Sequence, residues 1–139
     1  MTRFVKNKKN YYSKGMVFGV FDNLHHGHKY FLKEASKRCD KLIVVVTPTE
    51  IVELLKKHSP KNSFNERVLK IKEFNSNFFV ISGDSVLGEW NVLKKYPSDI
   101  VFLGYDQQEI SKELKKMNIP YIFLKPYRSK KYKSSVLGI

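Results

Sequence analysis

Short apolar segments alternate along the chain with segments of helical spacing. Continuous apolar runs, many of them β-branched, predict strands near 15–20, 41–47, 78–81, 99–104 and 120–124. Between them, apolar residues recur every three or four positions and predict helices near 27–38, 49–57, 65–74, 85–96 and 109–117. A strand that is apolar on both faces is covered by helices on both sides, as in the parallel sheet of an α/β fold. The pattern therefore predicts a doubly wound, five-stranded parallel sheet in a single domain.

The ends of the chain and its composition refine this picture. Residues 1–13 are polar, basic and without a period, so we expect a basic N-terminal tail at 1–13 and one domain at 14–139. A hydrophobic content of 42% favours a packed globular chain. No apolar run approaches the roughly 18 residues of a membrane span, and the N-terminus lacks the apolar core of a signal peptide. We therefore predict a cytoplasmic protein with no membrane span.

The net charge of +13 leaves several partners open. Nucleic acid, an anionic lipid surface or an anionic small substrate would each suit it, and so would a merely solvated surface. The basic residues gather at both ends of the chain, at Arg3, Lys6, Lys8, Lys9 and Lys14 and at Lys125, Arg128, Lys130, Lys131 and Lys133. Tyrosines near both clusters could stack on bases. A catalytically inactive, basic nucleic-acid-binding module on the same fold is therefore the alternative function, although it is not favoured.

The candidate chemistry lies where the first predicted strand turns into the first helix. An apolar run ends at Gly19, and the helical spacing begins near His28. The first turn of a helix presents unpaired backbone N–H groups and the positive end of the helix dipole, which together bind anions such as phosphate. Gly104 ends another strand at the same edge of the predicted sheet, where α/β folds bind ligands. A metal site at His25 and His28 is the alternative, but no third and fourth ligands lie nearby in the sequence.

The pattern Gly19-x-Phe21-Asp22-x-x-His25-x-Gly27-His28 resembles the signature of the cytidylyltransferase-like nucleotidyltransferases, a family that shares its H-x-G-H element with class I aminoacyl-tRNA synthetases. The resemblance implies a Rossmann-like nucleotidyltransferase fold. It also implies that His25 and His28 are catalytic and stabilise the α-phosphate of a nucleoside triphosphate. The nucleotide-binding residues that it implies in this stretch are Gly19, Val20, Phe21, Asp22 and Gly27.

Such a site suits attack by a phosphate oxygen on the α-phosphorus, with pyrophosphate leaving in line. Positioning and electrostatic stabilisation supply most of the catalysis in reactions of this kind.

Three further segments resemble elements of the same family. The turn Leu103-Gly104-Tyr105-Asp106-Gln107 is similar to its G-x-D-Q-type turn, which implies that Gly104, Asp106 and Gln107 bind nucleotide; Asp106 as a helix cap is the alternative. Glu66-Arg67 is similar to a helix start whose arginine, here Arg67, meets phosphate; a surface ion pair is the alternative. Lys56, Lys57 and Lys61 occupy the loop of a phosphate-binding lysine, and we take Lys57 as the catalytic candidate.

The last such segment, Tyr132 to Gly138, resembles the I-S-S/T-x-I-R element that closes over the triphosphate. Ser134 and Ser135 fit as nucleotide-binding residues. Leu137 replaces the usual isoleucine, and Gly138 stands where a basic residue often lies, so Arg128 is the catalytic candidate for the missing charge.

The resemblance implies transfer of CMP or AMP from CTP or ATP to a phosphorylated small-molecule acceptor, with release of pyrophosphate. Mg²⁺ or another divalent cation would accompany the triphosphate rather than be held by side chains. The small single-domain members resembled are glycerol-3-phosphate cytidylyltransferases and archaeal-type FAD synthetases, and the ending from Leu124 to Ser135 favours the second. The resemblance also implies a homodimer. The choice between cytosine and adenine stays open at this point.

Overall fold

The computed structural model describes residues 11–127, and within them five parallel strands form one sheet. The strands are β1 (Tyr12–Gly19), β2 (Cys39–Val46), β3 (Phe79–Ser82), β4 (Ile100–Leu103) and β5 (Tyr121–Phe123). Their order in the sheet is β3-β2-β1-β4-β5, so β1 is central and the strand order reverses beside it. The predicted doubly wound parallel sheet is confirmed.

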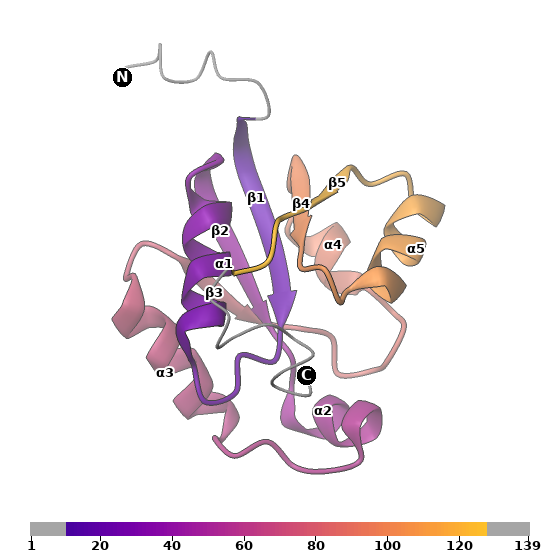
Figure 1. Ribbon diagram of the computed structural model, residues 1–139. Helices are drawn as coiled ribbons and strands as arrows, with labels where there is room; N and C mark the ends of the chain where they lie inside the picture. The colour runs from indigo at the N-terminus through magenta and orange to yellow at the C-terminus, as the bar shows by residue number, and fades with distance from the viewer. Residues whose placement is uncertain (1–10, 128–139) are drawn as a thin grey trace.

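The helices cover both faces of this sheet. They are α1 (His26–Ser36), α2 (Thr49–Lys56), α3 (Phe64–Phe74), α4 (Asn91–Lys95) and α5 (Gln108–Lys116). Helices α1 and α3 pack on one face and α4 and α5 on the other, whereas α2 lies beyond the carboxyl ends of the strands (Figure 1). None of the helices within residues 11–127 has the length and apolar character that a membrane crossing needs.

Successive residues of the central strands point into two separate cores, because side chains alternate between the faces of a sheet. Val17 packs in the core that contains Leu32 of α1, whereas its neighbour Met16 packs in the core that contains Leu114 of α5. All four side chains are fully buried. The continuous apolar runs in the sequence therefore arise because both faces of the sheet are covered.

Strand β1 begins earlier than its apolar run predicts. The Tyr12 N–H donates to the Arg38 carbonyl oxygen at 2.8 Å, and the Tyr12 ring packs edge-on against Phe102. Regular structure thus starts two residues before the border predicted at residue 14. The backbone pairing and ring packing of Tyr12 extend the sheet into a segment that the sequence pattern indicated to be only polar and basic.

The helix predicted over 85–96 is wrong for most of its length, because only Asn91–Lys95 is helical. Gly88 has φ +87° and Trp90 has φ +54°, and these left-handed conformations interrupt a right-handed helix. The Asp84 carboxylate instead accepts hydrogen bonds from the backbone N–H groups of Asn91 and Val92, which lie at the start of α4. Residues 83–90 therefore form a loop beyond the carboxyl end of β3.

Candidate active site

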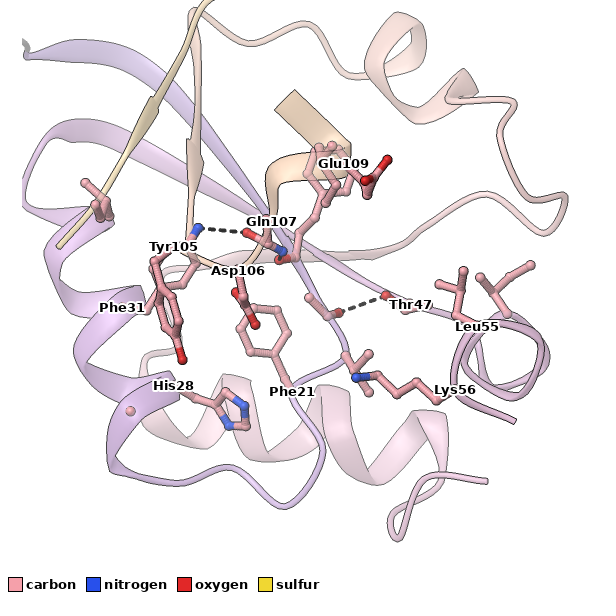
Figure 2. A pocket seen from close by; sticks show the side chains of 18 of the residues that line it. Phe21, His28, Phe31, Thr47, Leu55, Lys56, Tyr105, Asp106, Gln107 and Glu109 are labelled. Carbon is pink, nitrogen blue, oxygen red and sulfur yellow. Dashed lines mark hydrogen bonds between the residues drawn. The ribbon is translucent and has the colours of Figure 1, made fainter. Parts of the chain in front are cut away.

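A pocket of about 910 Å³ opens over the carboxyl ends of the strands, around the end of β1 (Figure 2). This is the edge at which doubly wound sheets bind ligands. Among the residues predicted from sequence, those that line it are Gly19, Val20, Phe21, His25, Gly27, His28, Gly104, Asp106 and Gln107. Three predicted residues within the described range do not line it: Asp22, Lys57 and Arg67. Arg128, Ser134 and Ser135 lie outside the described residues.

His25 and His28 cap the start of α1 with their own side chains. The Nδ1 atom of His25 accepts hydrogen bonds from the backbone N–H groups of Gly27 at 3.0 Å and of His28 at 3.4 Å. In return, Nδ1 of His28 accepts from the backbone N–H of His25 at 3.3 Å. This is the reciprocal pattern of a capping box, built here from two histidines. The motif that predicts phosphate chemistry thus also determines where α1 begins.

These hydrogen bonds determine the protonation state of both rings. A nitrogen that accepts a hydrogen bond carries no proton, so each ring is neutral and holds its proton on Nε2. Burial, together with the neighbouring His25, lowers the pKa of His28 to about 4, although Asp22 opposes the shift. Burial and His26 also lower the pKa of His25. At neutral pH the pair consists of two uncharged N–H donors, stacked with 3.7 Å between ring centroids.

Phe21 forms the floor of the pocket beneath His28. Its backbone has φ +52°, an unusual conformation for a bulky residue, and its side chain is buried. The Phe21 ring meets the His28 ring edge-on, with 5.6 Å between centroids. A Cβ atom added at Gly19 would lie 2.7 Å from the Phe21 ring, so glycine is required there. Gly19 and Phe21 together leave room for His28 and support its ring.

The turn after β4 is tied to the end of the central strand β1. The side chain of Gln107 accepts a hydrogen bond from the Gly104 N–H at 2.9 Å and donates to the Phe18 carbonyl oxygen of β1 at 2.8 Å. Gln107 is the N-cap residue of α5 but makes no capping hydrogen bond with its side chain. Within residues 11–127, Asp106 makes no capping contact either, and its exposed carboxylate lines the pocket (Figure 2). The alternative of Asp106 as a helix cap is therefore wrong.

Arg67 was predicted to meet phosphate or to form a surface ion pair, and the structure contradicts both. Its side chain is fully buried and does not line the pocket. Nη1 donates to the carbonyl oxygens of Val20 at 3.0 Å and Thr47 at 2.8 Å. Nε donates to the carbonyl oxygen of Asn62 at 3.3 Å, and Nη2 to Oγ1 of Thr49 at 3.0 Å. The guanidinium thus ties together the segments that follow β1 and β2 and precede α3.

Asp22 was predicted to bind nucleotide, but its carboxylate faces a different partner. It accepts hydrogen bonds from the backbone N–H groups of Lys61 at 2.7 Å and Asn62 at 2.8 Å. The Asn62 side chain in turn accepts from the Asn23 N–H at 2.9 Å. Asp22 therefore holds the loop between α2 and α3 against the turn that carries the histidines. Asp22 thus supports the turn that carries the histidines and does not itself line the pocket.

Lys57, the predicted catalytic lysine, lies at the C-cap of α2 with φ +60°, a left-handed conformation. Its neighbour Lys56 lines the pocket instead, and the Lys56 side chain extends from α2 toward the middle of the pocket (Figure 2). The structure therefore places Lys56, and not Lys57, at the pocket. Spacing along the sequence could not separate these two neighbours, because the last residue of the helix and its cap point in different directions.

Sequence reasoning missed the side of the pocket that α2 and the 83–90 loop form. Thr47 begins it, since its Oγ1 donates to the Gly19 carbonyl oxygen at 3.2 Å and joins the ends of β2 and β1. Leu55 and Trp90 also line the pocket. The position of Thr47 at the carboxyl end of a buried strand was a usable signal. The loop around Trp90 gave none, because its spacing imitated a helix.

Within residues 11–127, no cluster of three or more His, Cys, Asp or Glu side chains could hold a metal ion. The Nδ1 atoms of His25 and His28 are occupied by backbone N–H groups, which makes them unsuitable as ligands. The acidic residues that line the pocket are Asp84, Asp106, Glu109 and Glu113. The arrangement thus provides neutral donors, a helix N-terminus, a lysine and carboxylates around one pocket.

Comparison with known families agrees with this geometry. Residues 16–135 match the cytidylyltransferase-like family, and the chain belongs to that family. The matched residues include the end of β1, the turn after it and all of α1, and therefore His25 and His28. The resemblance drawn from the sequence motifs is thereby confirmed, and so is the prediction that the chain is a nucleotidyltransferase.

Two curated relatives are FAD synthases of archaea. The chain is 37% identical to the FAD synthase of Thermococcus sibiricus over 123 residues, which cover 85% of this chain and 81% of the relative. It is 39% identical to the FAD synthase of Aciduliprofundum boonei over 131 residues, which cover 88% of this chain and 82% of the relative.

Among solved structures, the lipopolysaccharide core biosynthesis protein of Thermoplasma volcanium matches with a TM-score of 0.70 and 28% identity, over 86% of this chain and 99% of that one. A bifunctional NMN adenylyltransferase/ADP ribose pyrophosphatase of Francisella tularensis, at 16% identity, shares the fold, with a TM-score of 0.60 over 86% of this chain and 39% of that one.

Proposed function

We propose that this chain transfers AMP from ATP to FMN and so forms FAD and pyrophosphate. The observation that carries the proposal is its similarity to archaeal FAD synthases, which spans 85% of the chain at 37% identity for the Thermococcus sibiricus relative. The pocket volume of about 910 Å³ supports it, since small-molecule sites span about 300 to 1,000 Å³ and this reaction brings two large substrates together.

In the proposed reaction, an oxygen of the FMN phosphate forms a bond to the α-phosphorus of ATP. The bond from the α-phosphorus to the oxygen that bridges the α- and β-phosphates breaks, and pyrophosphate leaves with that electron pair. No atom is oxidised or reduced. Negative charge grows on the α-phosphate oxygens and on the leaving group, so catalysis needs donors and cations at those positions.

His25 and His28 supply such donors to the α-phosphate. Each ring presents its Nε2–H while Nδ1 is held by the backbone, so the donor direction is fixed before substrate binds. The N-terminus of α1 adds the positive end of its dipole at the same place. Neutral rings avoid the competition for phosphate oxygens that two imidazolium cations would create with a divalent metal.

Lys56 and Asp106 contact the other parts of the substrates in this proposal. The ammonium of Lys56, which extends toward the middle of the pocket, binds phosphate oxygens. The Asp106 carboxylate accepts hydrogen bonds from the ribose hydroxyls of the nucleotide. Mg²⁺ or another divalent cation enters with the triphosphate and supplies charge neutralisation there. Arg128, Ser134 and Ser135 stay predicted phosphate-binding residues, and the homodimer stays a prediction.

The test is to incubate the protein with Mg²⁺ and each pairing of ATP or CTP with FMN or glycerol 3-phosphate. FAD is measured by chromatography with fluorescence detection, and pyrophosphate by a coupled assay. We expect FAD and pyrophosphate in equal amounts from ATP and FMN. Pyrophosphate release only from CTP with glycerol 3-phosphate would replace the proposal with a cytidylyltransferase. Release from none of the pairings would reject FMN as the acceptor.

A further inference from the structure

An apolar wall, which consists of Leu55, Val86, Leu87 and Trp90, lines one side of the pocket. The side chains of Leu55, Val86 and Leu87 are 56%, 52% and 56% exposed. Exposed apolar side chains gathered in one place mark a binding surface more often than scattered ones do. Within residues 11–127, eight large hydrophobic residues are exposed, and three of them, Leu55, Val86 and Leu87, belong to this wall. The wall is therefore a concentration of apolar surface at the candidate active site.

The loop that carries Val86, Leu87 and Trp90 is held in place by contacts with β1, β2 and α4. The Gly83 N–H donates to the Val46 carbonyl oxygen at 2.9 Å, which anchors the start of the loop to the end of β2. Trp90 packs edge-on against Phe18 of β1, with 5.4 Å between ring centroids. Asp84 accepts hydrogen bonds from the first N–H groups of α4 and so anchors the far end of the loop. These contacts hold Trp90 while leaving Val86 and Leu87 at the surface.

The opposite side of the pocket has different chemistry. It is formed by the turn after β4 and the start of α5, which carry the Asp106 and Glu109 carboxylates and the Gln107 amide beside the Tyr105 ring. In the sheet order β3-β2-β1-β4-β5, this turn and the apolar wall lie on opposite sides of β1, whose end leads to the histidines. If two substrates react beside the histidines, their remaining parts must occupy different sides of the pocket. A polar ribose suits the Asp106 side, and a flat apolar ring suits the other.

We propose that the apolar wall of Leu55, Val86, Leu87 and Trp90 binds the isoalloxazine ring of the acceptor. This inference rests on the proposed function, which names FMN as the acceptor. The ring is planar and has two apolar faces. Leucine, valine and tryptophan side chains bury such a face without needing hydrogen bonds. Lys56 is the neighbour of Leu55 on α2, so a cation lies within the same helix turn to meet the FMN phosphate.

The chain contains a single tryptophan, so Trp90 reports directly on this wall. Flavins absorb in the emission range of tryptophan, and we expect both FMN and riboflavin to quench Trp90 fluorescence in a saturable titration. Riboflavin lacks the phosphate, so its binding isolates the contribution of the ring. ATP alone, which we place on the Asp106 side, should leave most of the emission unchanged.

Leu55→Asn and Leu87→Asn should each raise the riboflavin Kd and the KM for FMN about tenfold, because each removes apolar contact with the ring. The KM for ATP should stay within twofold. Leu54→Asn is the matched control, since Leu54 is 64% exposed on the same helix but does not line the pocket. Its constants for riboflavin and FMN should stay within twofold of the parent values.

The outcomes separate this inference from the proposed function. If the parent protein forms FAD but both variants keep the parent KM for FMN and the parent riboflavin Kd, the wall is not the flavin site, although the function stands. If FAD does not form, the proposed function fails, and the titration decides the wall: no quenching by riboflavin overturns the inference. Analytical ultracentrifugation tests a third outcome. If the parent protein sediments as a dimer, and Leu55→Asn and Leu87→Asn dissociate that dimer without changing flavin binding, the wall is a contact between two copies and the inference is overturned.

Discussion

The two histidines and the charged residues Asp22 and Arg67 all lie in segments that resemble motifs of the family, but they serve different purposes. His25 and His28 line the pocket and are held neutral, with their protons on Nε2. Asp22 and Arg67 do not line it, and their polar atoms bind the backbone of the surrounding loops. These two charged residues thus hold the loops around the site in place, whereas the uncharged histidine donors line the pocket itself. If the loops that Asp22 and Arg67 hold were to move, the two imidazole rings would lose their positions in the pocket.

The largest effect should follow from removing one donor of the histidine pair. His28→Ala deletes the Nε2–H that we propose donates to the α-phosphate, and we expect kcat to fall about 10²- to 10³-fold. His26→Ala is the matched control, because His26 lies between the pair on the exposed side of α1 and does not line the pocket. Its kcat should stay within twofold. Equal losses in the two variants, measured by pyrophosphate release, would mean that α1 and not the donor is essential.

Arg67 should matter for stability more than for substrate binding. Arg67→Met leaves three backbone carbonyl oxygens and one hydroxyl without this donor, so we expect the free energy of unfolding in urea to fall by about 3 kcal/mol. Lys70→Met, at an exposed position of the same helix, should change it by less than about 0.5 kcal/mol. Unchanged stability together with a large rise in the KM for the triphosphate would restore the predicted phosphate contact.

The neutral state of His28 makes stability depend on pH in a defined window. Its pKa is about 4 in the folded protein and ordinarily 6.5, so between these values the unfolded chain binds a proton that the folded protein does not. The free energy of unfolding should therefore fall as the pH is lowered from 6.5 to 4, with no further loss from this group below 4. We expect a loss of about 2 kcal/mol, which is less than the full shift because the ring is partly exposed to solvent.

Urea denaturation at several pH values measures this loss, and the difference between the parent protein and His28→Gln isolates the contribution of the ring. If the free energy of unfolding changes with pH in the same way for the two proteins between pH 4 and 6.5, His28 titrates normally.

The smallest expected effect is a change in KM when one of two neighbouring lysines at the end of α2 is replaced. Lys56 lines the pocket and Lys57 does not, so Lys56→Ala should raise the KM for the phosphorylated substrates about tenfold, while Lys57→Ala should leave it within twofold. Steady-state kinetics for both variants under the same ionic conditions provide the measurement. The reverse order of effects would restore Lys57, the residue predicted from sequence, as the phosphate-binding lysine.

Much of the fold was predictable because the buried strands are apolar on both faces and their helices are amphipathic. The region around Trp90 was not, because its apolar spacing is helical while Gly88 and Trp90 adopt left-handed conformations. The position of the histidine turn was predictable from its motif, since a strand, a glycine and a helix start leave few alternatives.

The direction of individual side chains was not predictable in the same way. The same sequence pattern fits an arginine that contacts phosphate and an arginine that is buried below the pocket. Only the folded structure distinguishes the two, because it places the carbonyl oxygens of Val20 and Thr47 within reach of the Arg67 guanidinium. The apolar wall was equally hidden, because Leu55 and Leu87 come from segments that meet only in the folded chain.

The central claim is that His25 and His28 are neutral donors whose protons lie on Nε2, and nitrogen-15 NMR of the imidazole rings tests it most directly. Two-bond correlations distinguish the two neutral tautomers from each other and from the imidazolium ion. At pH 7 we predict the Nε2–H tautomer for both rings, and for His28 a titration with a pKa of about 4. An imidazolium ion at pH 7, a proton on Nδ1 of either ring, or a pKa of His28 near its ordinary 6.5 would contradict the account.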